Sequence, residues 1–190
     1  MRTRHGSHVV NEGRLYYVMG PSGAGKDSVL GWVRSHGVSH DVICAHRYIT
    51  RPAQAGGENH VALSEAEFLL RVHRGLFALT WRAHGLHYGI GREIEHWLER
   101  GAKVMVNGSR DAYLQALERY PALQPVLITA SRETMATRLA SRGRETSEDI
   151  AARLARSDAY QMPAGALVIH NDGDLAEAGA ALLDAITQTH

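Results

Sequence analysis

The sequence of 190 residues lacks the features that mark several large classes of protein. Cys44 is its only cysteine, which excludes a disulfide framework and a metal site built from several thiolates. No apolar run approaches the roughly 20 residues of a membrane-spanning helix, and residues 1–13 form a polar tail without the apolar segment of a signal peptide. The net charge is +1, too small for electrostatic binding of nucleic acid. We therefore expect a cytoplasmic protein that binds neither membranes nor nucleic acid.

Lysine is almost as rare as cysteine. Lys26 and Lys103 are the only two among the 21 basic residues, and all the others are arginine. Codon usage in a GC-rich genome accounts for most of this bias, although the planar guanidinium also suits phosphate groups. The 12 histidines show no HExxH motif and have scattered spacings, so we do not expect a histidine metal site. Hydrophobic residues make up 44% of the chain, which is typical of a globular domain.

Short apolar segments alternate with helical patterns along the chain. We expect strands at 14–19, 41–45, 104–106, 126–128 and 167–169, and helices at 27–36, 64–74, 92–100, 111–119, 133–141, from 147 onwards and at 175–186. The segment 76–87 has an extended pattern broken at Gly85, and 47–59 has the polar composition of a loop. Because buried parallel strands need helices on both faces, the pattern predicts an α/β protein with a mostly parallel sheet.

The clearest motif is GPSGAGK, which lies between a predicted strand and a predicted helix, the context that a Walker A motif requires. Its glycines allow successive backbone N–H groups to turn towards an anion at the positive end of the helix. Lys26 then reaches the outer phosphates of a nucleotide. The predicted ATP-binding residues are Gly20, Pro21, Ser22, Gly23, Ala24, Gly25, Lys26, Asp27 and Ser28.

The motif departs from the usual pattern directly after Lys26. A serine or threonine hydroxyl that ligates Mg²⁺ is expected there, whereas this chain has Asp27 followed by Ser28. A carboxylate is itself a good Mg²⁺ ligand, and without a metal its charge would repel the phosphates. We therefore favour Asp27 as the metal ligand; the alternative is that Asp27 caps the helix and Ser28 binds the metal.

Further segments resemble the guanylate kinase family over nearly the whole chain after residue 13. AHRYITRP is similar to the family's Ser-x-Thr-Thr-Arg-x-Pro, GLHYG to its Gly-Asn-Tyr-Tyr-Gly, LSEAEF to the stretch after its substrate-binding strands, and RLASRGRETSEDIAARL to its lid. The resemblance implies a P-loop NTPase fold in which a parallel sheet is flanked by helices. It also implies one domain at 14–190, with a substrate-binding insertion at about 47–90 and a helical lid at about 138–158, and ATP and Mg²⁺ as cofactors.

The acceptor site departs from this family. Guanylate kinases bind guanine through a glutamate and through acidic residues after the central strand, and these places hold Leu79 or Thr80 and residues 107–109 here. Losing both anionic acceptors would leave the guanine N–H donors without partners. GGENHVALSEAEF and VNGSR instead resemble the branch of the family that acts on ribose 1,5-bisphosphate in organic phosphonate catabolism. That branch transfers the ATP γ-phosphoryl to the 1-phosphate, giving 5-phospho-α-D-ribose 1-diphosphate.

The resemblance also implies roles for individual residues. Lys26, Arg142 and Arg153 are expected to act on the transferred phosphoryl group, with Arg138 and Arg144 less clearly assigned. The residues expected to bind substrate are Arg47, Arg51, His60, Tyr88, Asn107 and Ser109, with Glu58 and Asn59 nearby. Arg51 is the first candidate for an acceptor phosphate, and Asn107 and Ser109 are candidates for the sugar hydroxyls.

Other functions stay open at this point. A guanylate or other nucleoside monophosphate kinase would phosphorylate a mononucleotide instead of a sugar bisphosphate. A non-catalytic binding module would typically have lost the phosphate loop, which is intact here. A shikimate- or gluconate-type kinase would leave AHRYITR and HYGIG unexplained. The expected partner is a small-molecule substrate, and a homodimer is neither indicated nor excluded.

Overall fold

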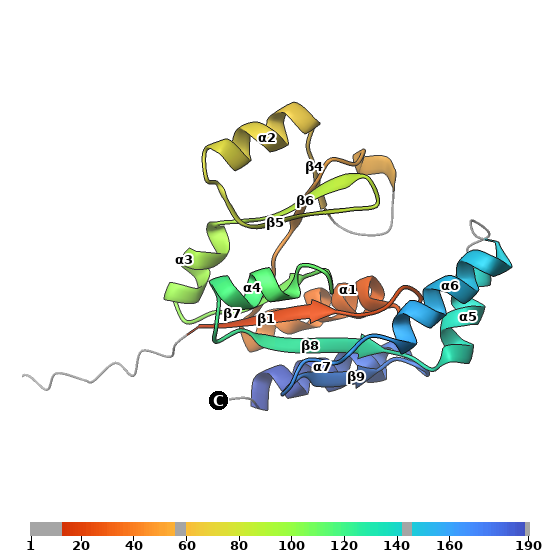
Figure 1. Ribbon diagram of the computed structural model, residues 1–190. Helices are drawn as coiled ribbons and strands as arrows, with labels where there is room; N and C mark the ends of the chain where they lie inside the picture. The colour runs from red at the N-terminus through yellow and green to blue at the C-terminus, as the bar shows by residue number, and fades with distance from the viewer. Residues whose placement is uncertain (1–12, 56–59, 142–145, 189–190) are drawn as a thin grey trace, which may run out of the picture.

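The computed structural model describes residues 13–55, 60–141 and 146–188, and within them it contains one sheet of five strands and one of four. Figure 1 shows the larger sheet between two layers of helices, and the smaller sheet, with helix α2 (Glu65–His73), as a second lobe beside it. No helix in these described segments is long and apolar enough to cross a membrane.

The larger sheet is parallel between all of its described strands. Their order is β2 (Val42–Cys44), β7 (Lys103–Asn107), β1 (Arg14–Met19), β8 (Gln124–Thr129) and β9 (Leu167–His170). In β1, Tyr16 and Val18 pack into one core cluster, whereas Leu15, Tyr17 and Met19 pack into another. This burial on both faces explains why β1 has a continuous apolar sequence.

Helices cover both faces of the larger sheet. On one face lie α1 (Lys26–His36), α5 (Arg132–Ser141), α6 (Ser147–Asp158) and α7 (Leu175–Gln188). On the other lie α3 (Glu93–Glu99) and α4 (Tyr113–Arg119). A short 3₁₀ helix, η1 (Gly37–His40), follows α1. The expected parallel sheet flanked by helices is confirmed, and the expected core elements end within two residues of those observed. The carboxyl ends of β1 and β7 meet at one edge, because Val18 pairs with Asn107.

The smaller sheet is built from the middle of the chain. Its described strands lie in the order β4 (His60–Ala62), β3 (Arg47–Ile49), β6 (Leu86–Gly91) and β5 (Phe77–Ala83). The β5–β6 hairpin turns at His84 and Gly85, whose φ angles of 51° and 75° match a tight two-residue turn. Phe68 of α2 stacks on Phe77 with ring centroids 4.7 Å apart, which joins the helix to the sheet.

The expectation of a loop over 47–59 is wrong for much of that segment. It contains β3 and a 3₁₀ helix, η2 (Ala53–Ala55), whereas residues 56–59, with Glu58 and Asn59, lie outside the described residues. β3 is short and only its last residue, Ile49, is fully buried. It becomes a strand because it pairs with β4 on one side and β6 on the other, and such tertiary pairing outweighs local composition.

Candidate functional site

The loop of residues 20–26 leaves the end of β1 and leads into α1. Gly23 and Gly25 have φ angles of 89° and 79°, which favour glycine strongly. A Cβ at Gly25 would lie 2.4 Å from Nδ2 of Asn171, so a side chain there would collide with its neighbour. Asn171 is 3% exposed and donates from Nδ2 to the Ala24 carbonyl at 2.7 Å. The loop is therefore held in one shape by the end of β9.

Lys26, Asp27 and Asn107 form a hydrogen-bonded triad at the edge where β1 and β7 end. Lys26 Nζ donates to Oδ1 of Asp27 at 3.1 Å and also to Oδ1 of Asn107. Asn107 Nδ2 in turn donates to Asp27 Oδ1 at 2.8 Å. Both polar ends of the Asn107 side chain thus bind the first two residues of α1. Its predicted contact with sugar hydroxyls stays a prediction.

The charges around Asp27 keep its carboxylate ionised. Burial alone would raise the pKa of Asp27, but the charges of Lys26 and Arg47 and the hydrogen bonds from Lys26 and Asn107 outweigh it and lower the pKa below the ordinary 3.8. Ser28 follows in the same helical turn and is exposed. Among the described residues no group of three or more His, Cys, Asp or Glu side chains could hold a metal. One carboxylate with a neighbouring hydroxyl fits Mg²⁺ that takes its other ligands from phosphates and water.

Two arginines from the hairpin of α5 and α6 reach the same loop. Arg153 of α6 donates from Nη1 to Oγ of Ser22 at 3.0 Å, and Arg138 of α5 donates from Nη1 to the Ala24 carbonyl at 3.4 Å. Thr146 begins α6 with a reciprocal capping box to Asp149, which fixes the start of the helix. Arg142 and Arg144 fall at 142–145, outside the described residues.

Arg47 and Tyr88, both predicted to bind substrate, lie together. The Arg47 guanidinium stands 5.2 Å from the centroid of the Tyr88 ring, a cation–π arrangement. The Trp81 ring stacks on the Tyr88 ring with an interplanar angle of 7°. Tyr88 is 7% exposed, so its ring is part of the packed interior and supports Arg47.

Arg51 and His60 form a separate pair. Nη2 of Arg51 lies 3.3 Å from Nδ1 of His60, and Nε2 of His60 lies 3.2 Å from the Arg51 carbonyl oxygen. One neutral tautomer satisfies both bonds, with Nδ1 accepting and Nε2–H donating. Arg51 lines a cleft of about 430 Å³ that shares no lining residue with the cleft beside Asp27 and Arg47. The structure therefore places the two predicted phosphate-binding arginines, Arg47 and Arg51, in different clefts.

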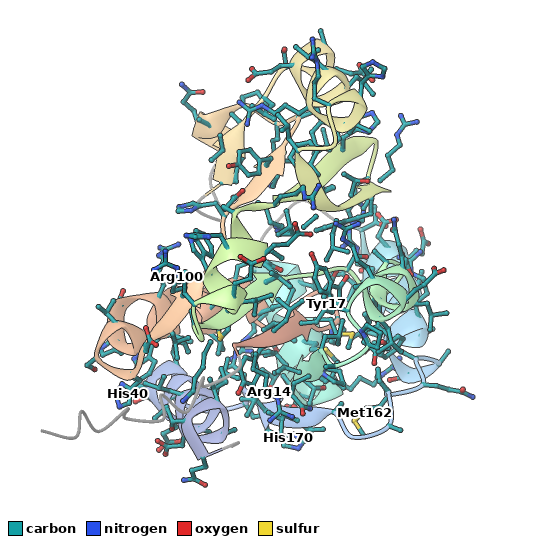
Figure 2. The ribbon with its side chains drawn as sticks, turned by 90° about the vertical axis from the view of Figure 1, so that its left-hand side faces the viewer. Arg14, Tyr17, His40, Arg100, Met162 and His170 are labelled. Atoms are coloured by element: carbon teal, nitrogen blue, oxygen red, sulfur yellow. The ribbon has the colours of Figure 1, made fainter. Side chains whose placement is uncertain are left out.

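Ser109 is engaged mainly by its neighbours. Its carbonyl accepts a hydrogen bond from the Tyr17 hydroxyl at 2.8 Å, and its Oγ accepts one from the Asp111 N–H at 3.3 Å. Tyr17 is fully buried and lies in the interior in Figure 2, where burial raises the pKa of its hydroxyl. These bonds order the turn after β7. The predicted contact of Ser109 with a sugar hydroxyl stays a prediction.

Sequence reasoning missed Asn171 altogether and named Arg138 only as a secondary candidate. Asn171 carried one usable signal, because a polar residue directly after a buried strand lies at the edge where sites form in parallel sheets. The exposed His40 and His170, both labelled in Figure 2, lie apart from each other.

Comparisons with known proteins place the chain among curated relatives. No protein-family model matches it. It is 56% identical over 171 residues to "Ribose 1,5-bisphosphate phosphokinase PhnN" of Chromobacterium violaceum, covering 90% of this chain and 92% of that protein. The protein of the same name from Desulfomicrobium baculatum is 54% identical over 178 residues, covering 93% and 95%. That from Laribacter hongkongensis is 58% identical over 171 residues, but the chain spans only 42% of its length.

Solved structures resemble the chain in fold. A guanylate kinase from Anaplasma phagocytophilum superposes with a TM-score of 0.67 at 17% identity, covering 93% of this chain and 85% of that one. A gluconokinase from Sinorhizobium meliloti has a TM-score of 0.51 at 18% identity, covering 94% and 93%. At these identities the likeness concerns the arrangement of helices and strands, and it is greater for the guanylate kinase.

Proposed function

Because the chain belongs to the ribose 1,5-bisphosphate phosphokinase family, we propose that it transfers the γ-phosphoryl of ATP to the 1-phosphate of ribose 1,5-bisphosphate. The product is 5-phospho-α-D-ribose 1-diphosphate, and the reaction serves organic phosphonate catabolism. The acceptor is already an ionised phosphate, so no general base is needed. The protein must instead align two anions and neutralise the charge that develops between them.

The triad of Lys26, Asp27 and Asn107 supports the donor half of this proposal. Lys26 and the amides of the 20–26 loop bind the outer phosphates of ATP, in a loop that Asn171 holds in shape. Asp27 or Ser28 holds Mg²⁺, which supplies charge neutralisation at the β- and γ-phosphates. Arg153, already in contact with Ser22, stabilises the transferred phosphoryl group.

Arg142 has the same proposed role as Arg153, and Arg47, close enough to lower the pKa of Asp27, orients the acceptor phosphate beside it. We propose that Arg51, with His60, also binds the acceptor phosphate when the smaller lobe closes over the core. Tyr88 contributes by supporting Arg47 from below.

One observation carries the choice of acceptor. Where a guanylate kinase has carboxylates for guanine, this chain has Asn107, whose side chain is bound to Lys26 and Asp27. Leu79, at the other such place, is 5% exposed and packed in a core cluster, and the neighbouring Thr80 pairs with Gly89 across the β5–β6 hairpin. Guanine would find no anionic acceptor at either place.

The test is a coupled assay of ATP consumption with ribose 1,5-bisphosphate, GMP and AMP as acceptors. We expect kcat/KM for the sugar bisphosphate to exceed that for GMP by about 10⁴-fold, the discrimination typical of a site that lacks the partners of a polar substrate. GMP as the better acceptor would replace the proposal with a nucleoside monophosphate kinase. ATP binding without turnover of any acceptor would indicate a binding module.

Replacing Asp27 by asparagine tests the metal site. We expect the variant to need at least about 10-fold more Mg²⁺ for half-maximal rate, because a neutral amide is a weaker ligand of a hard cation than a carboxylate. The measurement is the Mg²⁺ dependence of the rate at saturating ATP, with Ser28→Ala as the matched variant. An unchanged requirement in Asp27→Asn beside a shift in Ser28→Ala would assign the metal to Ser28.

The lowered pKa of Asp27 gives this site a defined pH dependence. Because the folded pKa is depressed, pairing with Lys26 and Asn107 stabilises the protein at pH values above the unfolded pKa of 3.8. That stabilisation is lost as the pH falls through the folded pKa. Protonation of Asp27 should therefore cause no loss of activity on the acid side until the pH falls below 3.8.

A further inference from the structure

A small polar cleft of about 120 Å³ opens beside the triad, along one side of α1. It is bounded by helix α1, by the segment between β2 and β3, and by β7. The residues that line it are Asp27, Leu30, Gly31, Arg34, Cys44, Ala45, His46, Arg47, Met105 and Asn107. The cleft thus begins at the proposed site of phosphoryl transfer and extends away from it.

Helical periodicity sets the length of this cleft. Asp27, Gly31 and Arg34 are spaced by four and three residues, so they lie on one face of α1. Seven residues at 1.5 Å each place Arg34 about 10 Å along the helix axis from Asp27. That separation suits a five-carbon sugar with a phosphate at each end, given the reach of the arginine side chain.

The residues that line the cleft favour a sugar phosphate over a nucleobase. Arg34 is exposed, lines the cleft, and makes no hydrogen bond or ion pair with any residue in the described parts of the chain. His46 and Arg47 lie beside it, whereas Asp27, the only carboxylate in the lining, is bound to Lys26. None of the described residues that line the cleft is Phe, Tyr or Trp, so a purine would find there none of the large aromatic side chains on which bases stack best.

We propose that Arg34 binds the 5-phosphate of the acceptor and thereby determines its specificity, while Arg47 holds the 1-phosphate beside Asp27. This inference rests on the proposed function and extends it to one end of the substrate. The bidentate fork of arginine matches phosphate geometry, and the charge is available without breaking another ion pair. A sugar without a 5-phosphate loses this contact but keeps those at the reacting end.

Replacement of Arg34 by glutamine tests the proposal, because glutamine keeps hydrogen-bonding groups and removes the charge. We expect KM for ribose 1,5-bisphosphate to rise about 10- to 100-fold, as for the loss of a hydrogen bond to a charged group. The values of kcat and of KM for ATP should not change. The wild-type preference for ribose 1,5-bisphosphate over ribose 1-phosphate should shrink by the same factor, and Arg34→Lys should restore part of it.

The matched control is Arg100→Gln, which removes an exposed arginine at the end of α3, labelled at the edge of the molecule in Figure 2. It should leave every constant unchanged. Equal losses with ribose 1,5-bisphosphate and ribose 1-phosphate in Arg34→Gln would overturn the proposal, since they would mean general damage. An unchanged KM would overturn it as well.

A binding measurement separates this inference from the proposed function. Calorimetric titration with ribose 5-phosphate, which carries only the 5-phosphate, needs no catalysis. We expect binding to the wild type to be weakened about 10-fold or more in Arg34→Gln and unchanged in Arg100→Gln. If the wild type fails to phosphorylate ribose 1,5-bisphosphate but shows this difference, the proposed function fails and the anion site stands. Equal binding to all three proteins overturns the role of Arg34 whatever the acceptor.

Discussion

Replacing Lys26 by methionine should lower kcat/KM for phosphoryl transfer by at least about 10³-fold. Methionine retains much of the aliphatic stem and removes the ammonium group that we propose binds the outer phosphates. In the structure that group is held by Asp27 and Asn107 at the carboxyl edge of the sheet, with 15% of the side chain exposed. A partly buried charge acts on a developing anion more strongly than a solvated one, so no other cation replaces it at low cost.

Lys103 provides the matched control, because it is the only other lysine and lies at the opposite end of β7 from Asn107. Lys103→Met should retain wild-type turnover. Both variants should show the wild-type far-UV circular dichroism spectrum, which separates catalysis from folding. Turnover in Lys26→Met within tenfold of wild type would remove the phosphate-binding assignment of the 20–26 loop.

Arg153→Ala should lower kcat by about 10³- to 10⁵-fold, the range found for arginines that stabilise a transferred phosphoryl group. Arg153 is carried by α6 and already contacts Ser22 of the loop. Because its charge acts mainly on the transition state, KM for ATP should change much less than kcat. Single-turnover measurements of product formation would report the chemical step directly.

Arg156→Ala is the control for this experiment, since Arg156 is exposed on the same helix and has the same charge. It should behave as wild type. A rise in KM for ATP with unchanged kcat in Arg153→Ala would make Arg153 a ground-state ligand of the nucleotide. Equal losses in both variants would point to damage in α6 itself.

The loop of residues 20–26 and the elements that flank it were predictable because their signals are local. The apolar run at 14–19, the glycines of the following loop and the amphipathic segment after Lys26 are contiguous in sequence. The conformation of each segment can therefore be predicted from its own residues, without knowing which distant residues it contacts. The choice of Asp27 as a site residue also came from its position relative to Lys26 alone.

The surroundings of the predicted substrate-binding residues were less predictable because long-range contacts determine them. The amide of Asn107 is a common type of partner for sugar hydroxyls, but no local pattern indicates that both ends of this side chain bind Lys26 and Asp27, some 80 positions earlier in the chain. β3 became a strand only through pairing with β4 and β6. Arg51 and Arg47 are four residues apart and both were predicted to bind substrate phosphate, with Arg51 first, but Arg51 pairs with His60 of β4.

The bond between Asn171 and Ala24 has a consequence for how the protein is made. The loop of residues 20–26 leaves the ribosome early, but the side chain that holds it is 147 positions later in the chain. Strands β8 and β9 must be added beside β1 before Asn171 can arrive, and contacts of such sequence separation form late. A growing chain that ends before Asn171 therefore has the loop amides but lacks the side chain that binds the Ala24 carbonyl at 2.7 Å. Any nucleotide affinity that depends on this bond is therefore acquired only after β9 has joined the sheet.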